Sequence, residues 1–285
     1  MIDLLSSGFY TSIQDQGRFN YTDYGVPLSG VMDNNLSELA NLLVGNSLDD
    51  ALIEMTLLGP KFRFYCSTTI SVTAVKAKVY VNSKIEKLNH QIKINAGDVL
   101  EVKEIQTRAY LAISGGFESE LKLGSQSQYE FITTSSRLTK GDKLKLKVQK
   151  QDFNVKHATI KFDFNLYKTD TLIVYPLPEF YDLNVEQKKY LVDKKFSISN
   201  QSNRMAYQLN EHIENNLKGI RSTPVIPGTV QLTPEGRLVI LMRDAQVTGG
   251  YPRIFQVSES SLNTLAQKSA NQNLKFKIKH NFNEI

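Results

Sequence analysis

A chain of 285 residues, of which 41% are apolar and 22% charged, has the composition of a globular protein and is long enough for one large or two smaller domains. It contains no Trp, which excludes indole stacking platforms, and a single cysteine, Cys66, which excludes an internal disulfide and favours a cytoplasmic location. No stretch has the apolar core of a signal peptide or 18 consecutive apolar residues, so we expect neither export nor a membrane span.

The net charge of +5 is concentrated in lysines, several of which alternate with apolar residues in DKLKLKVQK (142–150). In a strand, alternation puts the lysines on one face and Leu144, Leu146 and Val148 on the other. A solvated sheet face or a protected sheet edge explains this pattern better than nucleic-acid binding, for which no motif is present.

Most of the chain is typical of short strands separated by turns. Alternating patterns predict strands at 69–74, 78–82, 90–94, 98–104, 108–114, 159–164 and 171–177. Helices are expected at 34–44, between an Asp33 N-cap and Gly45, at 184–192, and at 259–268 after Ser258. Such closely spaced strands with few helices predict a mainly β protein of antiparallel, barrel-like sheets. A polar stretch near 150–158 predicts two domains, 1–155 and 156–285.

The polar, glycine-containing stretch 11–35 is the first candidate site. It is either a turn-rich surface loop or a loop that recognises a small polar substrate through amide and charged groups. Its candidate residues are Gln14, Asp15, Arg18 and Asp33.

The stretch 219–254 is the second candidate site. Its TPEG sequence predicts a hairpin between 228–233 and 237–243, which would bring Arg221, Thr229 and Gln231 near Arg243, Asp244 and Gln246. Adjacent glycines permit a positive φ or a close approach of backbone to a ligand, although a β-bulge and tight turn would use the same residues. The candidates are Arg221, Thr229, Gln231, Arg243, Asp244, Gln246, Thr248, Gly249, Gly250 and Tyr251.

Several familiar signatures are absent from the sequence. GVPLSGVM (25–32) has the glycine spacing of a phosphate loop, but Val31 and Met32 stand where Lys and Ser or Thr are needed. The four histidines are scattered without ligand spacing, and we expect no metal site.

The chain resembles the family known as allophanate hydrolase subunit 2 or biotin-dependent carboxyltransferase, which includes the C-type subunit of 5-oxoprolinase and KipA. The order and spacing of eight motifs carry this resemblance: TSIQDQGR, GVPLSGVMD, ANLLVGN, IEMTLLGP, ISGGF, LGSQS, IRSTPVIPGTVQL and LMRDAQVTGGYPRI. The resemblance implies two cyclophilin-like β-barrel domains. The sequence departs from the family at 128–144, where no glycine precedes Gly141, and at Thr73-Ala74, where Gly-Ala is usual.

The resemblance implies a companion subunit of the KipI or allophanate hydrolase subunit 1 type. Its favoured implication is the C-type subunit of an ATP-dependent 5-oxoprolinase, a hydrolase of a cyclic amide that is active only in complex with a lactam-hydrolase-type subunit and the KipI-type protein. In that reaction ATP activates the lactam of 5-oxoproline, and ring opening gives glutamate, ADP and phosphate. Two alternatives stay open: a carboxyltransferase subunit of a biotin-dependent urea carboxylase system, and a non-enzymatic antagonist of a histidine-kinase inhibitor.

The implied chemistry assigns roles by residue type. Positive groups near the activated amide oxygen would come from Arg18, Arg221 or Arg243. The lactam N–H and the substrate carboxylate need an acceptor and donors, for which the candidates are Asp15, Gln231, Asp244, Gln246 and the Gly249-Gly250 backbone.

Overall fold

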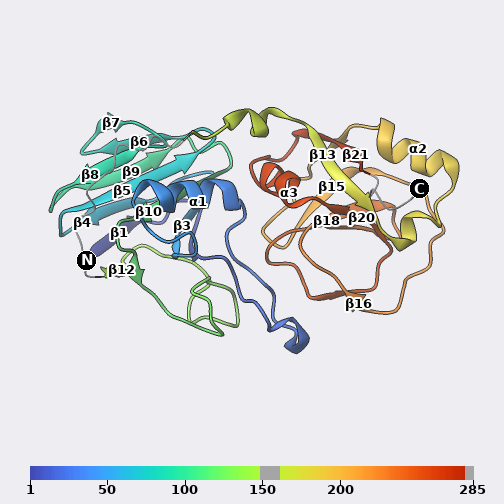
Figure 1. The fold of residues 1–285 in the computed structure, drawn as a ribbon, viewed down its shortest axis with the longest axis horizontal. Helices are drawn as coiled ribbons and strands as arrows, with labels where there is room; N and C mark the ends of the chain where they lie inside the picture. Colours follow the sequence, from blue (N-terminus) through green and yellow to red (C-terminus); the bar gives the residue numbers. More distant parts are fainter. Residues whose placement is uncertain (148–160, 280–285) are drawn as a thin grey trace. The chain divides into compact units, whose positions relative to one another are not determined.

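The computed structural model describes residues 1–147 and 161–279, which form two compact units (Figure 1). The first unit comprises Met1–Arg18 and Ser29–Phe164, and the second comprises Phe19–Leu28 and Asn165–Ile285. The predicted domain boundary at 155/156 lies outside the described residues. No sequence pattern indicated that the short segment Phe19–Leu28 groups with the second unit.

Two sheets build the first unit. The larger has the strand order β11-β12-β1-β4-β9-β6-β7 and the smaller the order β2-β3-β10-β5-β8. The strands are β1 (Ile2–Ser6), β2 (Tyr10–Gln14), β3 (Leu52–Thr56), β4 (Lys61–Phe64), β5 (Thr68–Ala74), β6 (Lys78–Val81), β7 (Lys84–Glu86), β8 (Gln91–Ile94), β9 (Val99–Lys103), β10 (Arg108–Ile113), β11 (Phe117–Glu118) and β12 (Lys143–Leu146).

Alternation along these strands fills a core to which both sheets contribute. Phe62 and Leu100 from the larger sheet and Ile53 and Leu111 from the smaller are fully buried in one apolar cluster. Inward apolar side chains alternate with outward polar ones on strands such as β4, so the pattern that predicted strands also predicted the core.

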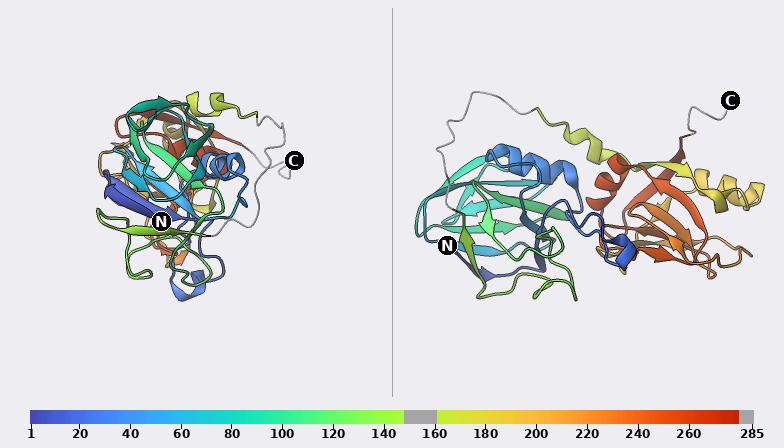
Figure 2. Two further views of the ribbon diagram at one scale, coloured as in Figure 1. Left: turned by 90° about the vertical axis from the view of Figure 1, so that its left-hand side faces the viewer. Right: turned by 60° about the horizontal axis from the view of Figure 1, so that its bottom comes forward.

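The helix α1 (Asn34–Leu43) covers the outer face of β5 and β10. The outward residues of β5 are small and polar because they meet helix backbone: the Oγ atoms of Ser71 and Thr73 donate to the carbonyls of Ala40 (2.6 Å) and Leu36 (2.7 Å). This explains why β10 is buried along its whole length and why Thr73 is accommodated where the resemblance implies glycine. Figure 2 shows α1, in blue, lying along the first unit.

The second unit is a single barrel-like sheet with the strand order β14-β21-β13-β20-β17-β18-β15. A bridge between Ile198 and Leu209 joins its two ends and closes it. The strands are β13 (Thr171–Pro176), β14 (Phe196–Ser197), β15 (Ala206–His212), β17 (Thr229–Leu232), β18 (Arg237–Leu241), β20 (Arg253–Val257) and β21 (Asn273–Ile278), with β16 (Thr223–Pro224) and β19 (Thr248–Gly249) forming a separate pair.

Aromatic side chains fill this barrel. The rings of Phe196 and Phe255 each lie 5.4 Å from that of Phe276, and Phe180 extends the row 5.2 Å from Phe255. Tilted rings at these separations are the favourable arrangement for aromatic pairs.

Two helices belong to the second unit. The helix α2 (Val185–Asp193) begins with a capping box of Asn184 and Gln187, and α3 (Glu259–Ala266) begins at the N-cap Ser258. Short 3-10 helices occur at η1 (Thr22–Tyr24), η2 (Phe164–Lys168) and η3 (Pro178–Phe180).

The mainly β, barrel-like fold and the expected helices are confirmed. The strand predicted at 159–164 is wrong over 161–164, which hold coil and the start of η2, and the rest of it lies outside the described residues. The two alternating aromatic residues of this segment pack against each other, because the ring centroids of Phe162 and Phe164 lie 4.7 Å apart. The expectation of antiparallel sheets misses one parallel pair, β13 with β21. The described residues contain no helix long and apolar enough to cross a membrane.

Candidate functional site

Asp15 joins two motifs that are more than a hundred residues apart. Its carboxylate accepts hydrogen bonds from the hydroxyls of Ser125 and Ser127 and from the backbone N–H of Gln126, each at 2.6 Å, and from Gly17 N–H at 2.9 Å. Because these donors occupy both oxygens, the carboxylate holds the segment QDQG (14–17) against the segment GSQS (124–127).

Arg18 and Gln14 are both completely buried beside this junction. Arg18 Nη2 donates to the carbonyl of Ser127, so it holds the same segment as Asp15. Gln14 Nε2 donates to Ser12 Oγ (3.0 Å) and to the carbonyl of Gln128 (3.2 Å), while its Oε1 is buried without a hydrogen-bond partner.

Asp33 is the N-cap of α1, as predicted: its Oδ1 accepts from the N–H groups of Asn35 (3.0 Å) and Leu36 (3.3 Å). Its own N–H donates to the hydroxyl of Tyr110 (2.9 Å). Burial, reinforced by the neighbouring charges of Glu54 and Asp33, raises the pKa of Tyr110 well above its usual value. Asp33 therefore caps helix α1, and its N–H donates to a tyrosine hydroxyl that is neutral.

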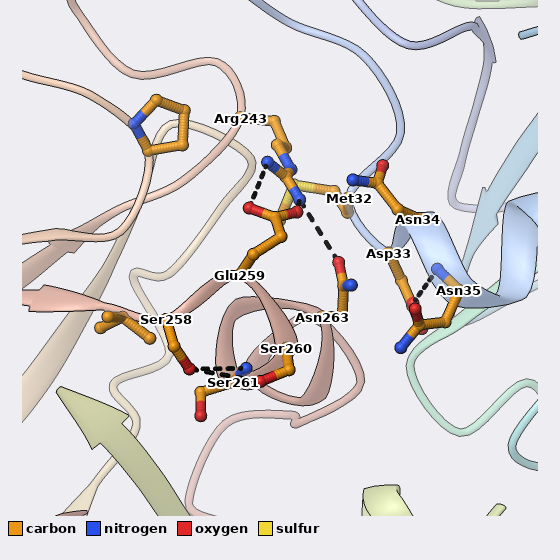
Figure 3. A network of polar contacts seen from close by, with 12 residues as sticks. Met32, Asp33, Asn34, Asn35, Arg243, Ser258, Glu259, Ser260, Ser261 and Asn263 are labelled. Carbon is orange, nitrogen blue, oxygen red and sulfur yellow. Dashed lines mark hydrogen bonds and ion pairs between the residues drawn. The ribbon is translucent and has the colours of Figure 1, made fainter. Parts of the chain in front are cut away.

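Arg243 follows β18 and is almost completely buried (Figure 3). Its Nη1 donates to Glu259 Oε2 (3.3 Å), and its Nη2 donates to Glu259 Oε1 and to Asn263 Oδ1 (3.3 Å). Its Nε is buried with no hydrogen-bond partner. A buried guanidinium held by one carboxylate and one amide is a strong potential contact for an anion.

Asp244 forms a second buried ion pair. Arg204 donates from Nε to Oδ2 at 2.8 Å and from Nη2 to Oδ1 at 3.0 Å, and the Asp244 N–H donates to the Arg204 carbonyl at 3.0 Å. This two-pronged contact ties the end of β18 to the segment before β15.

The predicted hairpin is confirmed: β17 and β18 pair with Gln231 opposite Val239. Thr229 Oγ1 donates to Gln256 Oε1 (3.1 Å), and Gln231 Nε2 donates to the carbonyl of Tyr251 (3.4 Å). Gly249 lies against that amide so closely that a Cβ there would be 2.4 Å from Gln231 Nε2. Gly249 therefore serves close packing against Gln231, a use that was not predicted, and neither Gly249 nor Gly250 adopts a positive φ.

The pair β16 and β19 aligns the remaining candidates. Ile220 N–H donates to the carbonyl of Gly250 (2.9 Å), which brings the Arg221 backbone beside the glycines. Arg221, Thr248, Gly250 and Tyr251 are exposed, and Gln246 is half-buried. The structure thus places some candidates of the second stretch in an exposed group around β16 and β19, whereas the buried Thr229, Gln231, Arg243 and Asp244 each have different partners.

Comparison with known proteins decides the family. Residues 24–278 match the family described as the carboxyltransferase domain, subdomains A and B. The chain belongs to this carboxyltransferase family.

Proteins that are similar to this carboxyltransferase-family chain include 5-oxoprolinase subunits and urea amidolyases. It is 29% identical to the C-type subunit of 5-oxoprolinase from Escherichia coli K12 over 97% of its own length and 90% of that protein. It is 41% identical to urea amidolyase of Lachancea kluyveri over 130 residues, which are 45% of this chain and 7% of that protein.

Solved structures share the fold. A crystal structure of K. lactis urea amidolyase superposes with a TM-score of 0.86 at 27% identity, covering 96% of this chain and 18% of that one. The chain spans between 18% and 56% of five solved chains that it matches.

Sequence reasoning missed the partners that define these sites. Ser125, Ser127, Arg204, Glu259 and Asn263 all contact predicted residues, but each lies at least 16 positions away along the chain. LGSQS is one of the motifs that carry the family resemblance. Its two serine hydroxyls were the only sign in the sequence that it could contact a carboxylate such as Asp15.

The stretch 25–33 does not fit the phosphates of ATP. Several of its N–H groups are used in internal hydrogen bonds: Gly25 and Val26 donate to the carbonyls of Thr22 (2.9 Å) and Tyr21 (3.3 Å), Val31 to the carbonyl of Asp15 (2.9 Å) and Met32 to the carboxylate of Glu54 (2.8 Å). A phosphate loop needs such groups directed at the ligand. Over residues 1–147 and 161–279, no three His, Cys, Asp or Glu side chains are grouped to hold a metal ion.

Proposed function

We propose that this carboxyltransferase-family chain is the C-type subunit of an ATP-dependent 5-oxoprolinase, which opens the lactam of 5-oxoproline to give glutamate. The observation that carries the proposal is the share of each protein over which the similarity extends. The chain is similar to the C-type 5-oxoprolinase subunits of E. coli and of Haemophilus influenzae over 97% of its own length and 90% of theirs. Its matches to the urea amidolyases cover only a small part of those proteins, 7% in sequence and 18% in the superposed K. lactis structure.

The chemistry of the second unit supports a small amide bearing a carboxylate as the substrate. Arg243 provides a desolvated cation, and the exposed Arg221 lies near the loop of Gly249 and Gly250. Cationic groups of this kind stabilise negative charge that develops on an amide oxygen.

The companion proteins complete the enzyme. They are a KipI-type (allophanate hydrolase subunit 1) protein and a lactam-hydrolase-type subunit. Because several N–H groups of the stretch 25–33 are used in internal hydrogen bonds, we assign ATP binding to a companion and not to this chain. The chain then contributes substrate contacts, and the assembly is the active hydrolase.

Reconstitution tests this proposal. The chain is purified with its two companions, and glutamate release from 5-oxoproline is measured with and without ATP. Turnover that requires all three proteins and ATP is the expected result. An assembled complex that binds together but releases no glutamate would refute the assignment. The two companions without this chain form the matched control.

Carboxyl transfer is the second candidate, favoured by the matched family itself and by the 41% identity with Lachancea kluyveri urea amidolyase over 130 residues. In that case a biotinylated partner would deliver the carboxyl group. Avidin would then abolish activity, whereas ATP-dependent lactam opening is unaffected by avidin. Adding avidin to the reconstituted assay therefore separates the two candidates.

A further inference from the structure

A cavity in the first unit contains none of the candidate residues of the two polar stretches. Its volume is about 250 Å³, and most of its lining comes from the loop 119–138, drawn in green beside β12 in Figure 1. The buried side chains of Ile13, Leu138 and Leu144 provide apolar surface, and the other lining residues are polar or charged. Small-molecule sites combine these two kinds of surface, and this volume suits a ligand smaller than a drug-sized molecule.

The GSQS segment connects this cavity to Asp15. Ser125 and Ser127 donate to the Asp15 carboxylate, each at 2.6 Å, whereas the alternate residues Gln126 and Gln128 line the cavity. Because Asp15 holds the two serines, it also fixes the backbone from which both glutamine side chains extend. The LGSQS motif therefore places two amide groups at the wall of the cavity.

Each of these amides keeps part of its hydrogen-bonding capacity. Gln128 Oε1 accepts from the Ile13 N–H at 2.9 Å, which leaves Nε2 as a donor with no protein acceptor among the described residues. Gln126 Nε2 donates to Ser119 Oγ at 2.6 Å, which leaves Oε1 as an acceptor with no donor in the same part of the chain. A ligand that carries both an acceptor and a donor satisfies the pair.

Two carboxylates of the lining are held by the protein itself. Glu120 accepts from the Thr134 N–H at 2.8 Å and lies 3.5 Å from Lys122 Nζ, and Asp142 accepts from the Thr139 N–H at 2.7 Å. The hydrogen bond from Thr134 is the main cause that lowers the pKa of Glu120, so this side chain stays negatively charged. Both groups add negative potential to the cavity without being free to bind a ligand.

Glu118 and Lys143 are the lining charges that remain for a ligand. Both residues are exposed, and neither side chain makes a hydrogen bond or ion pair within the described residues. A zwitterion meets both charges at once. Its ammonium group suits Glu118 and Gln126 Oε1, and its carboxylate suits Lys143 and Gln128 Nε2.

We propose that this cavity binds a free α-amino acid with an uncharged polar side chain. The lining holds three carboxylates, those of Glu118, Glu120 and Asp142, against the one ammonium group of Lys143. An amino acid of zero net charge is therefore preferred to an anion. The inference goes beyond the proposed function, because 5-oxoproline is not the expected ligand: its lactam nitrogen carries no positive charge for Glu118 to bind.

Titration calorimetry on the full chain, with L-glutamine as the probe, tests the site. We expect a Kd of about 1 mM or tighter, as a ligand of this size can reach. Binding of 5-oxoproline, which lacks the ammonium group, should be at least about tenfold weaker, and L-glutamate, with its second carboxylate, should also bind more weakly. A Kd for L-glutamine well above about 1 mM, or equal binding of 5-oxoproline, would overturn the inference.

Gln128→Glu tests the donor without disturbing its surroundings. The variant keeps the oxygen that accepts from the Ile13 N–H, but it replaces Nε2 by a negatively charged acceptor. L-glutamine should bind at least about tenfold more weakly, because the ligand carboxylate loses a donor and meets a like charge. Unchanged binding would contradict the proposed contact.

Gln106→Glu is the matched control for this variant. Gln106 is exposed in the same unit and does not line the cavity, so the substitution adds the same charge elsewhere. The control should bind L-glutamine as the natural chain does. An equal loss in both variants would indicate a general effect of net charge and would also overturn the inference.

Glu118→Gln tests the ammonium contact at an exposed position, where the chain is expected to fold normally. L-glutamine should bind about fivefold more weakly, and its preference over 5-oxoproline should fall by the same factor, because only L-glutamine carries the ammonium group. Glu130→Gln, at an exposed residue of the same loop outside the lining, is the control. A preference that Glu118→Gln leaves intact would count against the assignment.

Thermal unfolding followed by circular dichroism supplies a second readout. Saturating L-glutamine should raise the melting temperature of the natural chain and of Gln106→Glu, and should leave that of Gln128→Glu almost unchanged. An equal rise in all three would overturn the inference. All these measurements use the chain without its companions, so they and the reconstituted 5-oxoprolinase assay succeed or fail independently.

Discussion

Replacing Asp244 by alanine should destabilise the second unit strongly. The substitution removes both carboxylate oxygens that hold Arg204, at 2.8 Å and 3.0 Å, and the two side chains are only 11% and 9% exposed. Breaking a buried pair on one side typically costs about 3 to 5 kcal/mol, and the small remaining exposure of this pair favours about 3 kcal/mol.

Replacing both partners tests whether a stranded charge is the cause. The double variant Arg204→Met, Asp244→Leu removes both charges and keeps most of the volume, so it should be more stable than Asp244→Ala by at least about 1 kcal/mol. Asp182→Ala, at an exposed position of the same unit, is the control for loss of an acidic residue. Its unfolding free energy should stay within about 0.5 kcal/mol of that of the natural chain.

Urea unfolding followed by circular dichroism and tyrosine fluorescence measures these differences, since the chain has 13 tyrosines and no tryptophan. With two compact units, two transitions are expected, and Asp244→Ala should shift the one that belongs to the second unit. If Asp244→Ala unfolds within about 1 kcal/mol of the natural chain while the reconstituted complex loses turnover, the structural account is wrong, and Asp244 acts in the chemistry.

Three further predictions concern single residues. Asp15→Ala leaves two hydroxyls and two N–H groups without their acceptor and should lower the unfolding free energy of the first unit by about 3 kcal/mol in urea; a loss below about 1 kcal/mol would contradict the anchoring role. Gly249→Ala should cost about 1 to 3 kcal/mol because its Cβ would be 2.4 Å from Gln231 Nε2, and Gln231→Ala in the same chain should recover part of this loss; equal melting temperatures of the single and double variants would argue against the clash. Burial opposes ionisation of Glu179, but hydrogen bonds and charge from Arg253 outweigh it and lower the pKa, so this carboxylate contributes stability above its unfolded pKa that is lost as the pH falls below about 4. Glu179→Gln should therefore flatten the acid limb of the stability profile, and an unchanged acid limb would refute this contribution.

The features that sequence predicted well are local. Asp33 caps the helix that follows it, and the TPEG turn pairs Val230 with Ile240, because caps and hairpin turns are determined by residues only a few positions apart. The burial pattern of the strands followed from alternation for the same reason.

The features that sequence did not predict depend on distant parts of the chain. Leu172 pairs in parallel with Phe276, although alternation carries no information about strand direction. Asp15 was expected near the chemistry, but its partners Ser125 and Ser127 come from a motif that no local rule connects to it. A carboxylate looks the same in sequence whether it faces a ligand or four internal donors.

The pairing of β1 with the late strand β12 has a consequence for the synthesis of the first unit. β1, near the N-terminus, lies between β4 and β12 in the finished sheet, with Ile2 opposite both Phe64 and Leu144. A ribosome must therefore deliver about half of the polypeptide before β1 has both neighbours, and non-local pairing of this kind is slow. Until then the nascent chain exposes an unpaired apolar strand edge, so this protein should depend on chaperone protection during translation more than a helical protein of the same length.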